Sequence, residues 1–238
     1  MLSMPLISYR RHRFSPEIIS HCVWLYFRFQ LSFRDVQEMM AAQGVTVSHE
    51  AIRGWCEKFG RQYAHAIRVR MQGEVGDRWH LDEVYTKIAG RIRYLWRGVD
   101  QDGQVIDVLV QSRRDGYAAT RFFKQLRRKA GKAPRLVVTD KLASYAKPCA
   151  QVLPDSKHVS NKGQNNRAEN SHQPTRQRER RMRKFKSVAQ AQKFLSIYSQ
   201  MCNFFGLVRH TLSASNHRNL LASRLAEWRL LTLPSELI

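Results

Sequence analysis

The spacing of hydrophobic and polar positions changes near residue 74. Before that point, apolar residues recur at the three- and four-residue spacing of amphipathic helices. From about 74 to 205, short apolar runs with strand character alternate with helical stretches, and the remainder reads as helix with a short tail. We therefore divide the chain into three parts, residues 1–73, 74–205 and 206–238.

Capping residues divide the first part into three helices. Ser15-Pro16 predicts the start of the first helix, because it offers a capping hydroxyl followed by proline at the first helical position. Ser32 begins the second helix, and Asp35 three residues later completes a capping box. Ser48 caps the third helix, which we expect to end at Gly60.

The second and third helices resemble a helix-turn-helix, since a turn containing Gly44 joins them. In that motif the second helix enters the major groove with its N-terminal residues toward the bases. The base-facing residues would be His49, Glu50 and Arg53, with Lys58 toward phosphates. An ordinary helical hairpin gives the same pattern, and only the basic composition favours DNA binding.

The middle part predicts an α/β fold with a mixed sheet. Three consecutive strands, the last two joined by an Asp-Gly turn signal, are followed by helix, strand, helix and a weaker strand. The expected strands are 78–88, 94–99, 105–110, 136–139 and 157–159, and the expected helices are 117–128 and about 142–152. In this order the first and fourth strands can be neighbours. From residue 166 we expect one long helix that continues past residue 205.

Charge is the strongest global feature of the chain. Lys and Arg number 41 against 19 Asp and Glu, a formal net charge of +22. Such a surface attracts polyanions, so nucleic acid is the favoured partner over an anionic membrane or a ribosomal role. The four cysteines form no CxxC pair, which indicates reduced thiols rather than a zinc site. Without a signal-peptide pattern or a run of ~18 apolar residues, we expect a cytoplasmic, nucleoid-associated protein.

Three acidic residues stand where catalytic carboxylates would. Asp82 lies within the first strand, Asp140 directly follows a buried strand, and Glu169 lies early in the long helix. Glu83 is set aside, because successive strand side chains point to opposite faces. Converging carboxylates resist ionisation unless hard divalent cations neutralise them. Each acid alone could equally be a solvated surface charge or a helix cap.

The motifs around these acids resemble those of a known enzyme class. Residues 79–83 (Trp-His-Leu-Asp-Glu), 139–141 (Thr-Asp-Lys) and 165–172 (Asn-Asn-Arg-Ala-Glu-Asn-Ser-His) are similar to the catalytic motifs of bacterial insertion-sequence transposases of the Asp-Asp-Glu class. The similarity is greatest to compact single-gene elements that form cointegrates. It extends from Ser32 to beyond Phe205.

The resemblance implies a ribonuclease H-like catalytic domain behind a small all-α helix-turn-helix domain. Asp82, Asp140 and Glu169 would be both the catalytic residues and the ligands of two Mg²⁺ ions, with Mn²⁺ as an alternative. Water would cut the phosphodiester at an element end, and the freed 3′-hydroxyl would attack target DNA without a covalent protein–DNA intermediate. The partners implied are double-stranded DNA and a second copy of the chain, as a homodimer or higher oligomer.

Basic residues near the third motif extend the expected DNA surface. The resemblance implies a phosphate-positioning role for Arg176, seven positions after the glutamate. The other expected contacts are Lys141, Arg167, Arg178, Arg180, Arg181, Arg183, Lys184 and Lys186. A solvated helix face is the alternative for the run 176–186, but the run is expected to continue the helix that carries the glutamate, which favours DNA backbone contact.

One departure and several rival functions are weighed against this resemblance. Only 28 residues separate Asp140 from Glu169, fewer than the family usually has, so a loop or helix end before residue 165 must be shorter. A tyrosine recombinase and a serine or cysteine hydrolase lack their required motifs. A structure-specific nuclease of the same fold and a catalytically silent DNA-binding protein derived from a transposase remain as alternatives.

Overall fold

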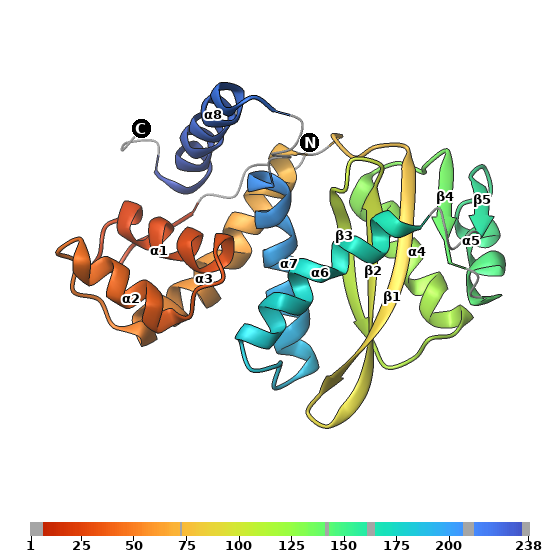
Figure 1. Ribbon diagram of the computed structural model, residues 1–238, viewed down its shortest axis with the longest axis horizontal. Helices are drawn as coiled ribbons and strands as arrows, with labels where there is room; N and C mark the ends of the chain where they lie inside the picture. Colours follow the sequence, from red (N-terminus) through yellow and green to blue (C-terminus); the bar gives the residue numbers. More distant parts are fainter. Residues whose placement is uncertain (1–6, 72, 141–142, 161–164, 207–211, 235–238) are drawn as a thin grey trace. The chain divides into compact units, whose positions relative to one another are not determined.

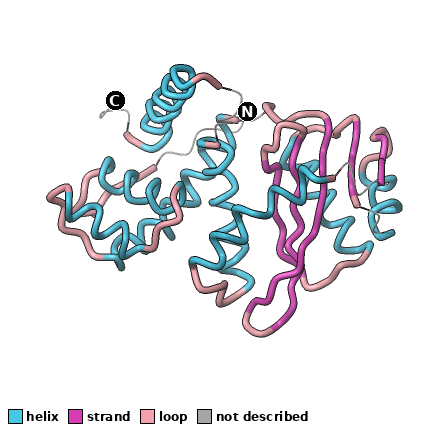
Figure 2. Tube along the Cα trace, in the orientation of Figure 1, coloured by secondary structure: helices cyan, strands magenta, loops and turns pink. Residues whose placement is uncertain are grey.

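The computed structural model describes residues 7–71, 73–140, 143–160, 165–206 and 212–234. The chain divides into two compact units. We call Met1–Arg70 together with Gln200–Ile238 the helical unit, and Met71–Ser199 the sheet unit. Figure 2 shows the strands gathered in the sheet unit.

The helical unit contains α1 (Pro16–Arg28), α2 (Phe33–Ala42), α3 (His49–Arg70) and α8 (Ala214–Thr232). The expected start signals are confirmed for α2 and α3. The Ser32 hydroxyl accepts from the Asp35 amide at 3.1 Å, and the Asp35 carboxylate accepts from the Ser32 amide at 2.8 Å. Ser48 accepts from the Ala51 amide at 3.2 Å. At α1, Pro16 takes the first position, while Ser15 makes no side-chain cap.

The third helix is longer than the sequence analysis predicts. It passes through Gly60 and ends at Arg70. Tyr63, Ala66 and Ile67 continue its buried face beyond the glycine. A glycine inside a helix costs about 1 kcal/mol, and burial of these side chains outweighs that cost.

The C-terminal helix belongs to the helical unit and is not a separate part of the molecule. The ring of Trp228 on α8 lies 5.1 Å from that of Tyr63 and 5.7 Å from that of Phe205. Glu227 also pairs with Arg70 at 2.5 Å. These partners are far away in sequence, so local pattern could not indicate them.

The sheet unit contains five strands in the order β3-β2-β1-β4-β5. They are β1 (Arg78–Ile88), β2 (Arg91–Asp100), β3 (Val105–Gln111), β4 (Leu136–Thr139) and β5 (Lys157–Ser160). β2 is antiparallel to both of its neighbours, β1 and β3, whereas β4 and β5 run parallel to β1. This mixed order is that of a ribonuclease H-like fold, so the predicted fold class and the pairing of the first and fourth strands are confirmed.

Helices cover both faces of the sheet (Figure 1). On one face, Phe122, Phe123 and Leu126 of α4 (Gly116–Ala130) are fully buried with Trp79 and Trp96 of the sheet. The short helices η1 (Ala143–Tyr145) and α5 (Ala146–Val152) pack beside α4. The other face carries α6 (Asn166–Arg181), which contacts β1 and β2.

The expected single long helix is in fact two helices. α6 ends at Arg181, and α7 (Val188–Phe205) begins after a short connection. Arg183 and Lys184 in that connection adopt left-handed φ values of 55° and 69°, which no α-helix can contain. Phe185 turns inward there and is buried, with its ring 5.8 Å from that of Phe194.

The four cysteines are free thiols, and three of them are buried. This agrees with the absence of a CxxC pair in the sequence. Along the described residues, no helix combines the length and the apolar character that crossing a membrane requires.

Candidate catalytic site

Parallel pairing of β1 with β4 brings two of the predicted acids together. The register joins Leu81 to Thr139, so the next residues, Asp82 and Asp140, follow side by side at the carboxyl end of β4. One carboxylate oxygen from each of Asp82, Glu83 and Asp140 lies within 4.8 Å of the other two. Three acids from two neighbouring strands therefore form one group.

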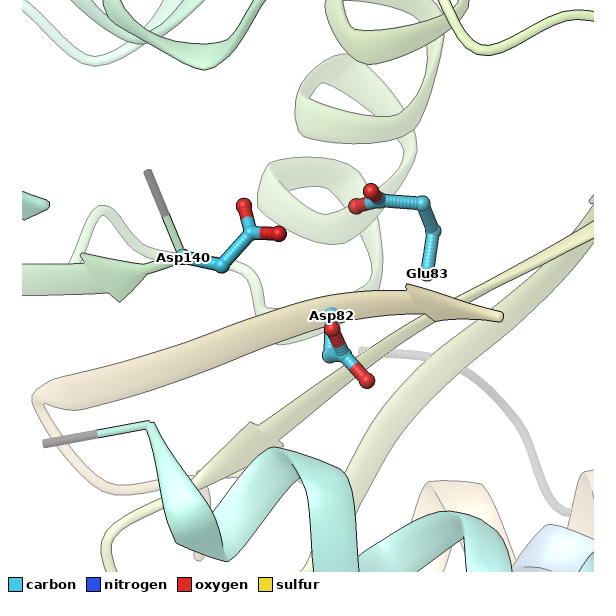
Figure 3. A group of neighbouring side chains, drawn as sticks. All are labelled: Asp82, Glu83 and Asp140. Atoms are coloured by element: carbon cyan, nitrogen blue, oxygen red, sulfur yellow. The ribbon is translucent and has the colours of Figure 1, made fainter. Parts of the chain in front are cut away.

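The side chains of the three acids project to two different sides of β1. Figure 3 shows Glu83 and Asp140 facing each other on one side of β1, while Asp82 points to the other side. Strand alternation thus separates Asp82 from Glu83 in direction, as the sequence analysis expects. It does not remove Glu83 from the acidic group, because neighbouring residues of one strand remain close at their backbones.

Glu83 is held on both of its carboxylate oxygens. The Arg114 guanidinium donates to one oxygen through Nε at 2.5 Å, and the Tyr145 hydroxyl donates to the other. The side chain is completely buried, and this burial raises the pKa of Glu83 to about 7, against the opposing effect of its two hydrogen-bond donors. Because both oxygens are engaged, Glu83 acts as an anchor for its neighbours.

Arg114 also connects Glu83 to Asp140, the residue that follows β4. Its second nitrogen, Nη2, lies 3.6 Å from Oδ2 of Asp140. The hydroxyl of Ser160 donates to the Asp140 carbonyl at 2.7 Å, which ties the same residue to β5. Sequence analysis did not identify Arg114 or Tyr145 as site residues. Both residues lie outside the predicted strands, and the pattern of the strands does not indicate that they approach the acids.

On the α6 side, a histidine contacts Asp82. Nε2 of His172 lies 3.3 Å from Oδ2 of Asp82, and both residues are buried. Burial lowers the pKa of His172, which keeps the ring neutral near pH 7. The sequence analysis quotes His172 in the third motif but assigns it no contact.

Buried polar side chains bond the start of α6 to β1 and β2. The amide of Asn165 donates to the carbonyl of Leu81, one residue before Asp82, at 2.8 Å. Arg97 of β2 pairs with Asp82 in the strand register and is buried. Its guanidinium donates to the Ser171 carbonyl at 2.8 Å and to the Thr175 hydroxyl.

A further hydrogen bond joins α6 to β1 near the end of the helix. The Thr86 hydroxyl of β1 donates to the Glu179 carboxylate at 2.7 Å. The third predicted acid, Glu169, is the fourth residue of α6 and stands one helical turn before His172.

The predicted DNA contacts near α6 fall into three groups. Lys141 lies outside the described residues, and Arg167 lies in the first turn of α6. Arg178 is a correction, because it is only 1% exposed and its guanidinium lies 5.7 Å from the centre of the Phe194 ring. It packs inside the sheet unit and offers no surface to DNA. The remaining residues of the run are exposed: Arg176, Arg180, Arg181, Arg183, Lys184 and Lys186.

The candidate base-reading residues lie at the start of α3. Arg53 is exposed, lies 3.3 Å from Glu50, and stands over the ring of Phe33 on α2. The His49 amide donates to the Gln37 side chain at 2.8 Å, which joins the start of α3 to α2. Lys58 is also exposed, five residues beyond Arg53 on the same helix.

A family model described as a DDE domain matches residues 76–206, which include the whole sheet and α6. The match covers more than half of the chain and contains all three motifs. The chain belongs to the DDE transposases of insertion sequences.

The relatives of this transposase agree with that assignment. It is 31% identical over 179 residues to the transposase for insertion sequence element IS257 in transposon Tn4003 of Staphylococcus aureus, covering 73% of this chain and 79% of that protein. Transposases for the IS431mec element of the same species match at the same identity and coverage. The protein is therefore a DNA transposase, a metal-dependent enzyme that cleaves DNA.

Solved structures similar to this transposase are retroviral integrases. One is the HTLV-2 integrase catalytic core domain in complex with magnesium, with TM-score 0.41 and 16% identity over 61% of this chain and 95% of that chain. Another is the simian T-cell lymphotropic virus intasome in complex with a PP2A regulatory subunit, with TM-score 0.42 and 14% identity over 69% of this chain and 57% of that chain.

The anchoring of Glu83 predicts a stability effect at Tyr145. The Tyr145→Phe substitution removes one donor from a buried carboxylate, so we expect the free energy of unfolding to fall by about 1–3 kcal/mol. Denaturant unfolding of the sheet unit, followed by tryptophan fluorescence, measures this loss. Tyr117→Phe is the matched control, because Tyr117 is 79% exposed and its hydroxyl faces water. Equal stability losses in the two variants would contradict the anchoring role.

Proposed function

We propose that Asp82, Asp140 and Glu169 are the catalytic triad with which this transposase cuts element ends and joins them to target DNA. The observation that carries the proposal is the pairing of β1 with β4, which gathers the two aspartates at one point of a ribonuclease H-like sheet. Each acid also lies in the motif that resembles the catalytic motif of its class.

The position of Glu169 in α6 supports its membership of the triad. Residues three apart on a helix share a side, and His172, three residues after Glu169, contacts Asp82 at 3.3 Å. Asn165 fastens the residue before α6 to the backbone of β1 beside Asp82. The beginning of α6 is therefore held at the catalytic strand despite the short interval after Asp140.

The donor set fits divalent metal ions, which are hard cations that prefer carboxylate oxygens. We propose two Mg²⁺ ions held by Asp82, Asp140 and Glu169, with Mn²⁺ as a substitute. When bound, such ions activate a nucleophilic oxygen and stabilise the leaving oxygen of a phosphodiester. The chain's own residues prepare the acids for this role: Arg114 balances the charge of Asp140, and neutral His172 contacts Asp82 without competing as a cation.

Two surfaces of the chain are proposed to hold DNA. In the helical unit, His49 and Arg53 at the start of α3 would reach base edges of the element end, with Lys58 on the backbone. In the sheet unit, the exposed cations from Arg176 to Lys186 would contact phosphates near the cut, together with Lys141 and Arg167. Since two element ends have to be joined in one reaction, we propose that a homodimer or higher oligomer acts on DNA of the nucleoid.

The triad proposal is tested by neutral substitutions of each acid. Asp82→Asn, Asp140→Asn and Glu169→Gln should each abolish nicking and joining of element-end DNA with Mg²⁺, because each removes a charged oxygen ligand. Affinity for the same DNA, measured by gel shift, should stay within about threefold of wild type, since other residues bind the backbone. Asp155→Asn, at an exposed aspartate, is the control. Full activity in any of the three variants would remove that acid from the triad.

Recognition of the element end is tested at Arg53. Arg53→Ala should weaken binding to the end sequence by about tenfold or more while random DNA is bound almost as before, because a base contact is worth about 1–3 kcal/mol of discrimination. Competition gel shifts with both DNAs measure the ratio. An equal loss on both would show that Arg53 touches only phosphates.

The basic run is tested by a matched pair of arginines on α6. Arg181 is exposed and Arg178 is buried on Phe194. Arg181→Ala should reduce the slope of log affinity against log salt by about one, because one phosphate contact is lost. Arg178→Ala should leave that slope unchanged and instead lower the melting temperature. A salt slope that changes only with Arg178 would reverse the assignment.

A further inference from the structure

The hairpin formed by β1 and β2 exposes apolar side chains that no part of the catalytic site explains. Tyr85 is 75% exposed and Ile92 is 58% exposed. Lys87 stands directly across from Ile92 in the register, and residues directly opposite in an antiparallel pair share a face. We call Tyr85, Lys87 and Ile92 the hairpin surface.

The hairpin extends beyond the strands that flank it. β3 pairs with β2 only from Tyr94 onward, and β4 pairs with β1 only as far as Leu81. Figure 1 shows the two strands continuing past the rest of the sheet to their turn. On the α6 face, Thr86 is bonded to Glu179. The opposite face of this extension carries Tyr85.

This exposed face is continuous with the catalytic acids. Tyr85 follows Glu83 by two residues on β1, so the two side chains emerge on the same face about 7 Å apart along the strand. Arg114 and the carboxylate of Asp140 lie on that face as well, as their contacts with Glu83 and each other show. Figure 3 shows Asp140 and Glu83 on this side of β1. An aromatic ring therefore stands beside the acids and open to solvent.

The charge of the hairpin indicates the chemical class of its partner. No acidic residue occurs between Val84 and Val99. Lys87 lies on the hairpin surface, whereas Arg91 and Arg93 stand opposite Ile88 and Thr86 and so lie on the other face of the hairpin. Two copies of this basic hairpin would repel each other, which argues against its use as a contact between protomers. A polyanion with flat apolar groups satisfies both the cations and the ring, and nucleic acid has this chemistry.

We propose that the hairpin surface binds DNA at the cut, with the Tyr85 ring stacked on a nucleobase displaced from the duplex next to the scissile phosphate. Lys87, on the same face as the ring, contacts the flanking backbone. A base outside the duplex offers its face to an aromatic ring whatever its identity, so the contact is independent of sequence. The inference rests on the proposed function, because it takes the acids beside Tyr85 as the place of cleavage.

Binding is tested apart from cleavage with the inactive Asp82→Asn protein. Element-end DNA carries 2-aminopurine at the nucleotide next to the cut, since this base changes its fluorescence when it leaves the stack. Asp82→Asn should change the fluorescence, and so should the double variant with Tyr85→Phe, which keeps the ring. The double variant with Tyr85→Ala should lose the change while melting at the same temperature, because the ring is exposed. An unchanged signal with Tyr85→Ala would overturn the proposal.

The rate of nicking provides the second readout in the otherwise native protein. Tyr85→Ala should slow nicking of paired DNA by about tenfold or more at saturating DNA, the scale of one lost stacking contact. A mismatch at the displaced nucleotide should recover part of that loss, because the base is already unpaired. Leu230→Ala, at another exposed apolar residue, is the control.

The outcomes separate this inference from the proposed function. Normal nicking by Tyr85→Ala, or equal losses in Tyr85→Ala and Tyr85→Phe, would overturn the stacking role and leave the triad intact. If Asp82→Asn itself nicked DNA, the triad would fail, and the fluorescence arm would still decide whether Tyr85 contacts a base.

Discussion

The group of acids formed by Asp82, Glu83 and Asp140 depends on the parallel pairing of two short stretches of strand. β4 has only four residues, and its hydrogen bonds to β1 and β5 leave it buried inside the sheet. The strand carries unbroken apolar side chains because both of its faces are covered. The pairing ends at Thr139. Asp140 is therefore the first residue after the paired stretch, and it lies beside Asp82. A shift of one residue in this register would turn Asp140 away from the face that it shares with Glu83.

The carboxylates that this pairing brings together repel one another, and hydrogen-bond donors and cations around them offset this repulsion. These groups are distributed unevenly over the two faces of the sheet. On the α4 face, Arg114 and Tyr145 engage Glu83, which leaves Asp140 as the acid at the open end of the network. On the α6 face, the neutral ring of His172 contacts Asp82, and the buried Arg97 stands opposite Asp82 in the strand register. A cation therefore lies near the acids on each face of the sheet, Arg114 on the α4 face and Arg97 on the α6 face. A chain of net charge +22 thus keeps a small acidic region at β1.

Local pattern predicted the sheet well because its signals are local. The alternation over 78–88, the Asp-Gly turn and the apolar run before Asp140 each occupy a few residues and agree with one another. Two helix ends were misplaced because glycine and basic residues act differently in context: Gly60 lies inside a buried helix, and the chain turns at Arg183 because Phe185 packs inward.

The supporting residues of the site could not be predicted in the same way. Arg97 looks like an ordinary basic residue in a strand, and only the tertiary structure shows its bonds to α6. By sequence, Arg178 belongs to a run of surface cations. In the structure, it lies on the buried side of α6, where its guanidinium packs against the ring of Phe194. Motif resemblance predicted the acids, while the residues around them depend on contacts between positions 31 to 93 residues apart.

The docking of α8 against the first helices has a consequence for how the protein is made. The helical unit is assembled from both ends of the chain, and the sheet unit is inserted between them. During synthesis the sheet unit can emerge and fold while Trp228 is still to be translated, and domains generally fold as units in that order. Tyr63 and Phe205 are synthesised earlier, and their ring contacts with Trp228 can form only after α8 has been made. A ribosome that stops early would thus release a protein with a complete sheet and an open helical unit.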